Sequence, residues 1–446
     1  MRLVIDTETD GLLDTVSKIH CISTKEIDTG RVRNFGPDEV GRGLKLLARA
    51  ELLVAHNGIG YDIPAIKKLY PTWETKAKVI DTLVLARVLW PEIKKSDYAR
   101  WRDGRLPGQL IGAHKLKAWG YRLGVLKGDY GEQENAWEVF TPEMLEYCEQ
   151  DVHVTDRLWE TIQKKKPDPR MVDLELECAW ILESQMRTGY PFKEREARAL
   201  YATLSGARQE SYENCRDMVS PWYVPVRKKG VTVVQSPKRD NRTLGYTQDS
   251  PFCPVKLVEF NPGSDQQVAD RLQELYGWEP TEFTDTGLPS VTEEVLEGID
   301  NDLARAVARY AMLDKRISQL AEGKGAWLSA VKADGRIYGY INQSGTVTGR
   351  ASHSKPNLGQ VPSCKKPYGP ECRALFHVPE TFDGQEWEQL GTDLSGLELR
   401  CLGHFMAAFD RGAYITELLE GDIHTANQLA AGLPDRDMAK TFISMG

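Results

Sequence analysis

Short apolar strand patterns alternate with amphipathic helical patterns in the first third of the chain, and this alternation limits the possible folds more than any other feature. The strand patterns lie at 2–6, 18–27 and 51–57, and helical patterns lie at 62–70 and 141–166. A strand period that repeatedly gives way to a helical period is typical of an α/β domain. The sequence therefore predicts an α/β domain with a mixed sheet.

Changes of pattern divide the chain into four predicted parts. The polar, proline-containing run KKKPDP predicts the end of the first domain, 1–168. Long helical patterns then predict a helical domain at 169–329, interrupted by a short basic insertion at about 222–260. The pattern next becomes α+β, which predicts a further part at 330–421 and the start of another at 422–446.

Composition is typical of a soluble globular protein. The 446 residues are 41% hydrophobic and 27% charged, and they lack the run of about 18 apolar residues that a membrane span needs. The N-terminus reaches acidic residues too soon for a signal peptide, so we expect a cytoplasmic protein with no membrane partner. Eight scattered cysteines without a CxxC pair predict reduced thiols, with neither a zinc site nor a disulfide framework.

Acidic residues recur at the ends of strand patterns and on one later helix. Asp6 and Glu8 share one face of the first strand, because side chains in a strand alternate with a period of two. Asp62 follows another apolar strand, and Tyr147 and Asp151 are one turn apart on a helix. Four acids from three elements predict a site for two divalent metals, one to generate hydroxide and one to stabilise the leaving oxygen in phosphodiester hydrolysis. Tyr147 would orient the attacking water.

Each of these residues, taken singly, admits a structural interpretation. Asp62 could cap the helix that it begins. Asp6 could be a turn residue at the end of a strand, and Tyr147 with Asp151 could form a solvated helix face. The joint occurrence of all the residues in this order favours the metal site over these alternatives.

A second group of residues lies near the end of the chain. Asp393 is predicted at a strand end, where a carboxylate can meet a metal, and a turn aspartate is the alternative. Glu398 also fits a capping box with Ser395. Arg436 and Lys440 are one helical turn apart and suit a triphosphate, whereas an ordinary exposed first turn is the alternative.

The first group of motifs resembles a known nuclease family. DTET, HNxxxYD and YxxxD, in that order, resemble the three motifs of the DnaQ-like, DEDD-type 3′→5′ exonucleases of the tyrosine-bearing subgroup. The resemblance implies that Tyr147 orients the attacking water. It implies that the metal ligands are Asp6, Glu8, Asp62 and Asp151.

The whole chain resembles the family A DNA polymerases of the bacteriophage T-seven type. DLSGLELR with the RxxxK of RDMAK resembles motif A and the opening of motif B, and TGRASHSKPNLGQVP and GDIHTANQ resemble further segments. The resemblance implies a ribonuclease H-like exonuclease domain with a mixed sheet, a helical thumb with an insertion, a partial α+β palm and the start of the fingers. This is a Klenow-like architecture that is incomplete.

The same resemblance implies roles for residues of the second half. Asp393 would bind both catalytic metals, and each active site would use two Mg²⁺ ions, for which Mn²⁺ can substitute. The residues implied to bind the incoming nucleotide are His424, Arg436, Lys440 and Glu398. The residues implied to lie along the DNA are Arg350, Asn357 and Gln360.

Two departures from the family pattern predict an incomplete polymerase site. The second palm carboxylate that two-metal phosphoryl transfer needs has no counterpart, so we expect no polymerisation by this chain alone. Ser444 stands where the family has an aromatic residue, and the sequence stops at Gly446, which predicts a truncated reading frame. We expect residues from about 436 onward to be frayed or wrongly docked, because a short helix without its packing partner is marginal in water.

Three functions follow from these patterns. The leading hypothesis is a metal-dependent 3′→5′ exonuclease, the proofreading part of a phage replicative DNA polymerase, acting in the host cytoplasm on primer–templates and single-stranded 3′ ends. One alternative is a subunit of a split polymerase, completed by a second chain. The other is an inactive module that binds primer ends.

The sequence does not decide which partner the basic insertion binds. A net charge of −8 argues only weakly against nucleic-acid binding, because grooves can be basic in an acidic chain. The basic side chains could bind the DNA backbone or lie in a solvated loop, and host thioredoxin is only a weak expectation from the resemblance. These residues are Arg227, Lys228, Lys229, Lys238, Arg239 and Arg242.

Overall fold

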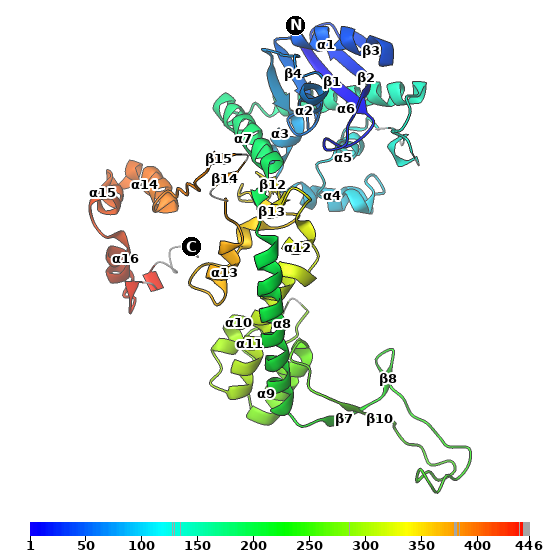
Figure 1. Ribbon diagram of the computed structural model, residues 1–446, viewed down its shortest axis with the longest axis vertical. Helices are drawn as coiled ribbons and strands as arrows, with labels where there is room; N and C mark the ends of the chain where they lie inside the picture. Colours follow the sequence, from blue (N-terminus) through cyan, green and yellow to red (C-terminus); the bar gives the residue numbers. More distant parts are fainter. Residues whose placement is uncertain are drawn as a thin grey trace. The chain divides into compact units, whose positions relative to one another are not determined.

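The computed structural model divides the chain into two compact units, Met1–His377 and Val378–Gly446 (Figure 1). None of the helices in the described part of the chain is both long enough and apolar enough to cross a membrane. The residues that the structure describes are 1–126, 128, 130–133, 135–284, 286–378, 381–382, 384–436 and 438–439.

A five-stranded sheet forms the centre of the first domain (Figure 1). β1 pairs antiparallel with β2 and parallel with β4, and β4 pairs parallel with β5. The sheet is therefore mixed, and the predicted α/β domain is confirmed. In order across the sheet, the strands are β3 (Val32–Phe35), β2 (Ile19–Glu26), β1 (Arg2–Thr9), β4 (Leu52–Ala55) and β5 (Lys78–Asp81).

Alternation along β1 separates two hydrophobic layers. Leu3 and Ile5 belong to one layer, which α1 and α2 cover. Val4 belongs to the other, which includes α3, α5 and α6. The even-numbered side chains that follow Val4 in β1 therefore lie on the α6 side of the sheet. The helices of this domain are α1 (Val40–Ala48), α2 (Asp62–Leu69), α3 (Thr82–Leu89), α4 (Ile93–Arg102), α5 (Leu116–Leu123) and α6 (Pro142–Lys164).

One ion pair is enclosed between α4 and α5. Arg122 donates from Nε and Nη2 to the carboxylate of Asp97 at 3.1 and 2.6 Å, and both side chains are almost fully buried. The backbone N–H of Gly112 donates to the same carboxylate at 2.9 Å. Burial alone would raise the pKa of Asp97, but the bonds from Arg122 and Gly112 outweigh it and lower that pKa. Asp97 is therefore an ionised structural residue.

Two long helices of the following region pack against each other. Arg208 of α8 pairs with Asp314 near the end of α11 at 2.9 Å. Cys215, near the end of α8, shares a hydrophobic cluster with Leu303 at the start of α11. This order of contacts makes the pair antiparallel. The helices of this region are α7 (Pro169–Thr188), α8 (Glu194–Asp217), α9 (Asp265–Tyr276), α10 (Glu293–Glu297), α11 (Asp302–Ile317), α12 (Trp327–Ala330) and α13 (Gly369–Ala374).

The insertion forms a β-ribbon that leaves the end of α8 (Figure 1). β7 (Trp222–Pro225) pairs antiparallel with β10 (Val255–Val258), and β8 (Arg227–Lys228) pairs with β9 (Val231–Thr232). The Trp222 ring anchors the ribbon, because the guanidinium of Arg271 in α9 lies 4.2 Å from its centroid. The remaining strands of this unit are β6 (Tyr190–Pro191), β11 (Arg336–Ile337), β12 (Tyr340–Asn342) and β13 (Ser352–Ser354).

The second unit corrects two predictions. The strand predicted to end at Asp393 is absent from the described residues, where Asp393 lies exposed in a segment without regular secondary structure. A strand requires a neighbour to complete its hydrogen bonds, and no described residue pairs with this segment. The capping box of Ser395 is also absent, because Gly396 is the N-cap of α14 and no side chain caps it. The elements here are β14 (Thr381–Phe382), β15 (Gln385–Glu386), α14 (Leu397–Asp410), α15 (Ala413–Glu420) and α16 (Ile423–Ala431).

We predict that Asp97→Ala destabilises the first domain by about 3–5 kcal/mol, because it leaves Arg122 buried without its carboxylate. The matched control is Asp103→Ala, which removes an exposed partner of Arg105 and should change stability by less than about 1 kcal/mol. Urea unfolding of the full chain, followed by tryptophan fluorescence, measures both. Equal effects of the two substitutions would contradict a structural role for the buried pair.

Candidate active site

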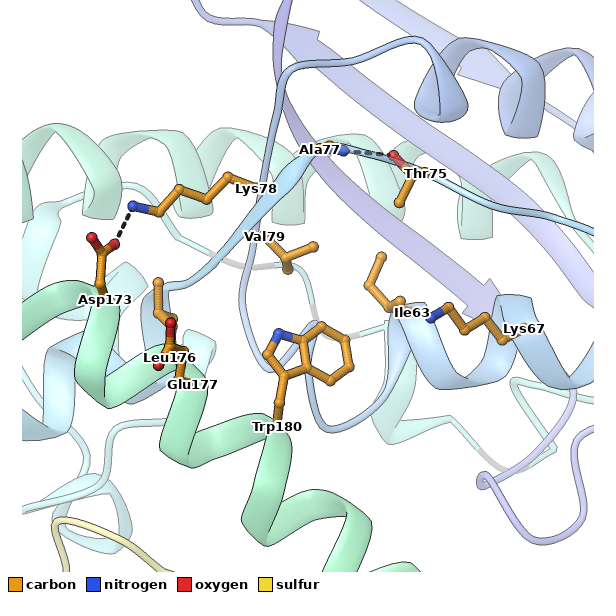
Figure 2. A pocket seen from close by; sticks show the side chains of 10 residues that line it. All are labelled: Ile63, Lys67, Thr75, Ala77, Lys78, Val79, Asp173, Leu176, Glu177 and Trp180. Atoms are coloured by element: carbon orange, nitrogen blue, oxygen red, sulfur yellow. Dashed lines mark hydrogen bonds and ion pairs between the residues drawn. The ribbon is translucent and has the colours of Figure 1, made fainter.

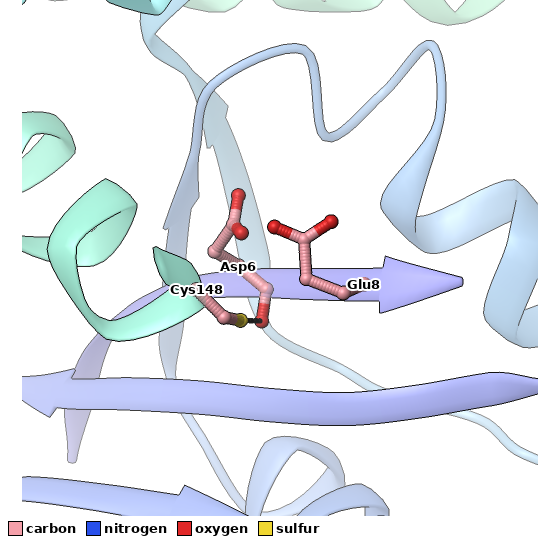
Figure 3. Close-up of side chains that lie close together, drawn as sticks. All are labelled: Asp6, Glu8 and Cys148. Atoms are coloured by element: carbon pink, nitrogen blue, oxygen red, sulfur yellow. Dashed lines mark hydrogen bonds between the residues drawn. The ribbon is translucent and has the colours of Figure 1, made fainter. Parts of the chain in front are cut away.

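Two carboxylates lie side by side on one face of β1, as the strand period predicts (Figure 3). A carboxylate oxygen of Asp6, one of Glu8 and the Sγ atom of Cys148 all lie within 4.8 Å of one another. Among the described residues, this is the group of three ligand atoms close enough to share a cation. Asp6 lies inside β1, so its interpretation as a turn residue is wrong.

Cys148 of α6 is a member of this group that the motifs did not indicate. Its thiol donates to the carbonyl oxygen of Asp6 at 3.4 Å (Figure 3). Burial raises the pKa of the Cys148 thiol well above its usual range, so the sulfur keeps its proton. The site therefore presents carboxylate oxygens to a cation. No sequence signal could have shown this contact, because it depends on how α6 packs on β1.

Asp62 begins α2 and bonds back to β1. Its Oδ1 accepts from the Thr7 N–H at 3.1 Å and from the Thr7 hydroxyl at 2.7 Å. The β1–β4 ladder ends at Val4, so Asp62 satisfies a backbone donor beyond the ladder. The helix-cap interpretation is wrong, because Tyr61 is the N-cap and no side-chain bond caps α2. Burial raises the pKa of Asp62 to about 6 despite the bonds from Thr7.

Asp81 holds the loop that delivers Asp62. It is 1% exposed and accepts from the N–H groups of Asn57 and Ile59 at 2.9 and 3.1 Å. A Cβ at Gly58, between them, would lie 2.5 Å from a side chain of β4, so the loop requires glycine there. Asp81 was not among the predicted site residues. Its signal is an aspartate between a strand pattern and a helical pattern, which is typical of an N-cap.

α6 presents Tyr147 and Asp151 four residues apart, as predicted. Asp151 is 3% exposed, so the interpretation as a solvated helix face is wrong for this residue. Tyr147 is half-buried, and its ring centroid lies 5.8 Å from those of both Tyr130 and Trp137. These two aromatic neighbours restrict the orientation of the Tyr147 ring.

The residues present fit divalent cations with oxygen ligands. Asp6 and Glu8 supply two carboxylates at ligand spacing, and Mg²⁺ is commonly bound through one or two carboxylates with water completing the shell. Asp62 and Asp151 lie outside the 4.8 Å group, at the start of α2 and on α6. The structure thus brings together two of the four predicted ligands, and places the other two on elements that contact or cover β1.

Three predicted DNA-contacting residues lie in turns of the first unit. Arg350 closes a tight turn, because its N–H donates to the Thr346 hydroxyl at 2.9 Å and its carbonyl accepts from the Thr346 N–H at 3.2 Å. Asn357 caps a short 3₁₀ turn that Gln360 ends. The Gln360 carbonyl accepts from Gln319 Nε2 at 3.2 Å. These contacts hold the backbone, and contact with DNA stays a prediction for all three.

Asp393 and Glu398 are both exposed in the second unit, before α14 and in its first turn. The structure does not place either of them in a cluster of three or more possible ligands among the described residues. A metal site at Asp393 and a nucleotide contact of Glu398 therefore stay predictions.

The predicted phosphate-binding residues lie at the start of α16 and after it. His424 is in the first turn, and its N-cap Asp422 accepts from Arg436 at 2.9 and 3.1 Å. The bond from Arg436 lowers the pKa of Asp422. Lys440 lies outside the described residues, as do Ser444 and most of the segment expected to fray. The one-turn spacing of Arg436 and Lys440 stays a prediction.

A groove of about 430 Å³ lies between α2, β5 and α7 (Figure 2). Of the predicted site residues that the structure describes, none lines this groove. Lys78 and Asp173 form an exposed ion pair at one side. The lining residues are Ile63, Lys67, Thr75, Ala77, Lys78, Val79, Asp173, Leu176, Glu177 and Trp180.

Two family models match two separate segments of the chain. Residues 3–163 match the RNase_H superfamily, and residues 248–441 match DNA polymerase family A. A nuclease-type sheet domain that carries paired carboxylates thus precedes a polymerase segment. The class of protein is a DNA polymerase with its own nuclease-type domain.

Phage polymerases resemble the chain along its length. It is 39% identical to the DNA-directed DNA polymerase of Enterobacteria phage T3 and 38% identical to that of Escherichia phage T7. Each alignment covers 99% of this chain and 74% of the phage protein. The chain therefore belongs to the family A DNA polymerases, and the predicted family is confirmed.

A solved structure shares the fold. The POL domain of Pol1 from M. smegmatis, solved in complex with DNA primer-template and dNTP, has a TM-score of 0.64 and 16% identity. The match covers 100% of this chain and 66% of that one. At this identity the likeness shows the fold alone, and it confirms the predicted polymerase architecture.

We predict that Mg²⁺ raises the melting temperature of the first domain more at about pH 8 than at about pH 5. The folded-state pKa of Asp62, about 6, is above the value of about 3.9 in an unfolded chain. The metal-free fold therefore loses stability as pH rises from the unfolded pKa of Asp62 to its folded pKa. Above the folded pKa, a cation that binds ionised Asp62 offsets this loss of stability.

Calorimetry of the full chain with and without Mg²⁺ at both pH values measures this difference. Asp62→Asn, which cannot ionise, is the control and should reduce the pH dependence of the Mg²⁺ effect. An equal Mg²⁺ effect at both pH values in the unaltered protein would contradict the prediction.

Proposed function

We propose that the chain is a metal-dependent 3′→5′ DNA exonuclease, the proofreading part of a phage replicative DNA polymerase. The observation that carries the proposal is the pair of carboxylates at Asp6 and Glu8, within 4.8 Å on one face of a central strand. Membership of family A supports the proposal, because the nuclease-type domain precedes a polymerase segment in one chain.

Asp6, Glu8, Asp62 and Asp151 would hold the cations in this proposal. Two Mg²⁺ ions, or Mn²⁺ in their place, would activate a water and stabilise charge on the leaving 3′ oxygen. Tyr147, held by its aromatic neighbours, would orient that water for attack on the terminal phosphodiester. Thr7 keeps Asp62 turned toward β1, and Cys148 ties the backbone of Asp6 to α6.

We propose further that the chain extends a primer only when a second palm carboxylate joins Asp393. Two-metal nucleotide transfer needs carboxylates that bridge both ions, and Asp393 is exposed outside any cluster in the described residues. In a second candidate function, the chain is a non-covalent subunit of a split polymerase.

An apolar face in the second unit favours the split-subunit candidate. Leu402, Phe405 and Phe409 recur at helical spacing along α14, and they are 45%, 73% and 90% exposed. Contiguous apolar surface of this kind marks an interaction site. The chain that would cover it carries the second carboxylate. No contact among the described residues supports binding of host thioredoxin, which stays a prediction.

We predict that Asp6→Asn lowers Mg²⁺-dependent removal of 3′ nucleotides by about a thousandfold or more. Losing a metal ligand removes several kcal/mol of transition-state stabilisation, and each 1.4 kcal/mol is a factor of ten. Asp28→Asn is the matched control, because Asp28 is an exposed carboxylate of the same domain that pairs with Arg2. Cleavage of a 5′-labelled single strand by purified chain measures both rates. Substantial activity in Asp6→Asn would refute the assignment.

A labelled primer–template, Mg²⁺ and all four nucleotides separate the remaining functions. Shortening without extension supports the exonuclease, and extension that appears only with an added chain supports the split subunit. DNA binding without cleavage would identify an inactive primer-end module. Extension by this chain alone would show that a second carboxylate is already present.

A further inference from the structure

The β-ribbon of residues 222–258 differs in charge from the rest of the chain. It contains seven basic residues and two acidic ones, whereas the whole chain has a net charge of −8. Six of the basic residues form two groups of three, which we call the near triad and the far triad. The near triad is Arg227, Lys228 and Lys229, and the far triad is Lys238, Arg239 and Arg242.

The near triad sits in a tight hairpin. β8 and β9 pair on either side of Lys229 and Gly230, which have φ values of 48° and 82°. These positive φ values make the chain reverse within two residues. The hairpin continues from the β7–β10 pair, because the N–H of Val226 donates to the carbonyl of Pro254 at 2.8 Å and the carbonyl of Val226 accepts from the N–H of Val233 at 2.8 Å. All three side chains of the near triad are exposed at the turn.

The far triad sits in a loop whose backbone is closed by its own hydrogen bonds. Asn241 and Tyr246 exchange backbone bonds of 2.8 and 2.9 Å, and the Asp249 N–H donates to the Pro237 carbonyl at 2.9 Å. The ring of Tyr246 stacks on Phe252 with centroids 4.5 Å apart. The backbone groups and rings therefore satisfy one another, and the three basic side chains are exposed.

The carboxylates of the ribbon do not neutralise these cations. Asp240 accepts from the Gln248 N–H at 2.7 Å, and Asp249 accepts from the Gln248 side chain at 3.3 Å. Within the described part of the chain, no ion pair joins either triad to a carboxylate. Six exposed like charges on one ribbon repel one another, and an anionic partner would remove that repulsion.

From this charge pattern we infer that the ribbon binds the phosphate backbone of duplex DNA through both triads. A two-stranded β-ribbon has the width that the major groove admits, and lysine and arginine at turns reach phosphates on either side of it. The ribbon is anchored at one end only, where Trp222 packs on Arg271, so the triads are carried on its free part. This inference rests on the proposed function, which makes DNA the substrate.

The test measures how the affinity for duplex DNA depends on salt. Each phosphate that a side chain neutralises contributes about 0.9 to the slope of log affinity against log salt concentration. Replacing either triad by alanine should reduce the magnitude of that slope by about 2 to 3 and weaken binding at low salt. Fluorescence anisotropy of a labelled duplex with the full chain, in EDTA to prevent cleavage, gives the slope.

Two further variants serve as controls. Arg42, Lys45 and Arg49, replaced together by alanine, remove the same charge from α1, which covers the sheet layer opposite Asp6 and Glu8. That variant should keep the slope of the unaltered protein. Replacing the three arginines of the two triads by lysine keeps the charge and should also preserve the slope.

Unchanged slopes for both alanine triads would overturn the inference and leave the ribbon as a protein-binding or solvated segment. A slope change in the α1 control equal to that of the triads would also overturn it, because the effect would then follow net charge alone. Cleavage of a short single strand in Mg²⁺ is measured separately. Its absence in the unaltered protein would refute the proposed exonuclease without affecting the slopes.

Discussion

The repulsion between the Asp6 and Glu8 carboxylates is the constraint on which the nuclease domain depends. β1 is hydrogen-bonded to β2 on one side and β4 on the other, so the Cβ atoms of Asp6 and Glu8 are held on the same face of the sheet. Burial of their neighbours lowers the local dielectric and strengthens the repulsion. A divalent cation between the two carboxylates reduces this repulsion. The pairing of both acids on one strand face therefore favours metal binding more than either residue would alone.

Buried carboxylates in this domain divide into structural and chemical groups by the donors that they meet. Asp97 is neutralised by a buried arginine, and Asp81 is saturated by backbone N–H groups. Asp62 accepts two hydrogen bonds from a single neutral residue, Thr7, and burial raises its pKa. A buried acid without a cationic partner is the kind that gains most from a metal. Burial also raises the pKa of Asp81, but backbone N–H groups hold this residue in its loop, whereas Asp62 is proposed to hold an ion.

Charge in this chain is organised locally, and its total says little about binding. The net charge of −8 coexists with a ribbon of seven basic and two acidic residues. Asp6 and Glu8 lie together on β1, whereas the two basic triads of the ribbon form no ion pair with a carboxylate among the described residues.

Sequence alone determined the mixed α/β domain, the helical character of the region that follows it and the shared face of Asp6 and Glu8, because these depend on short-range periodicity and on the chemistry of single side chains. It also supported the family, through motifs that lie far apart in the chain. It failed at the strand before Asp393 and the capping box of Ser395, because a strand depends on a neighbour and a cap on the local backbone.

Only the tertiary structure decided that Cys148 contacts Asp6 and that Asp62 bonds to Thr7 and does not cap its own helix. It also decided that Asp81 holds the loop that precedes α2. Each of these contacts joins residues more than 20 positions apart in the chain, so the packing of α2, α3 and α6 around β1 sets them.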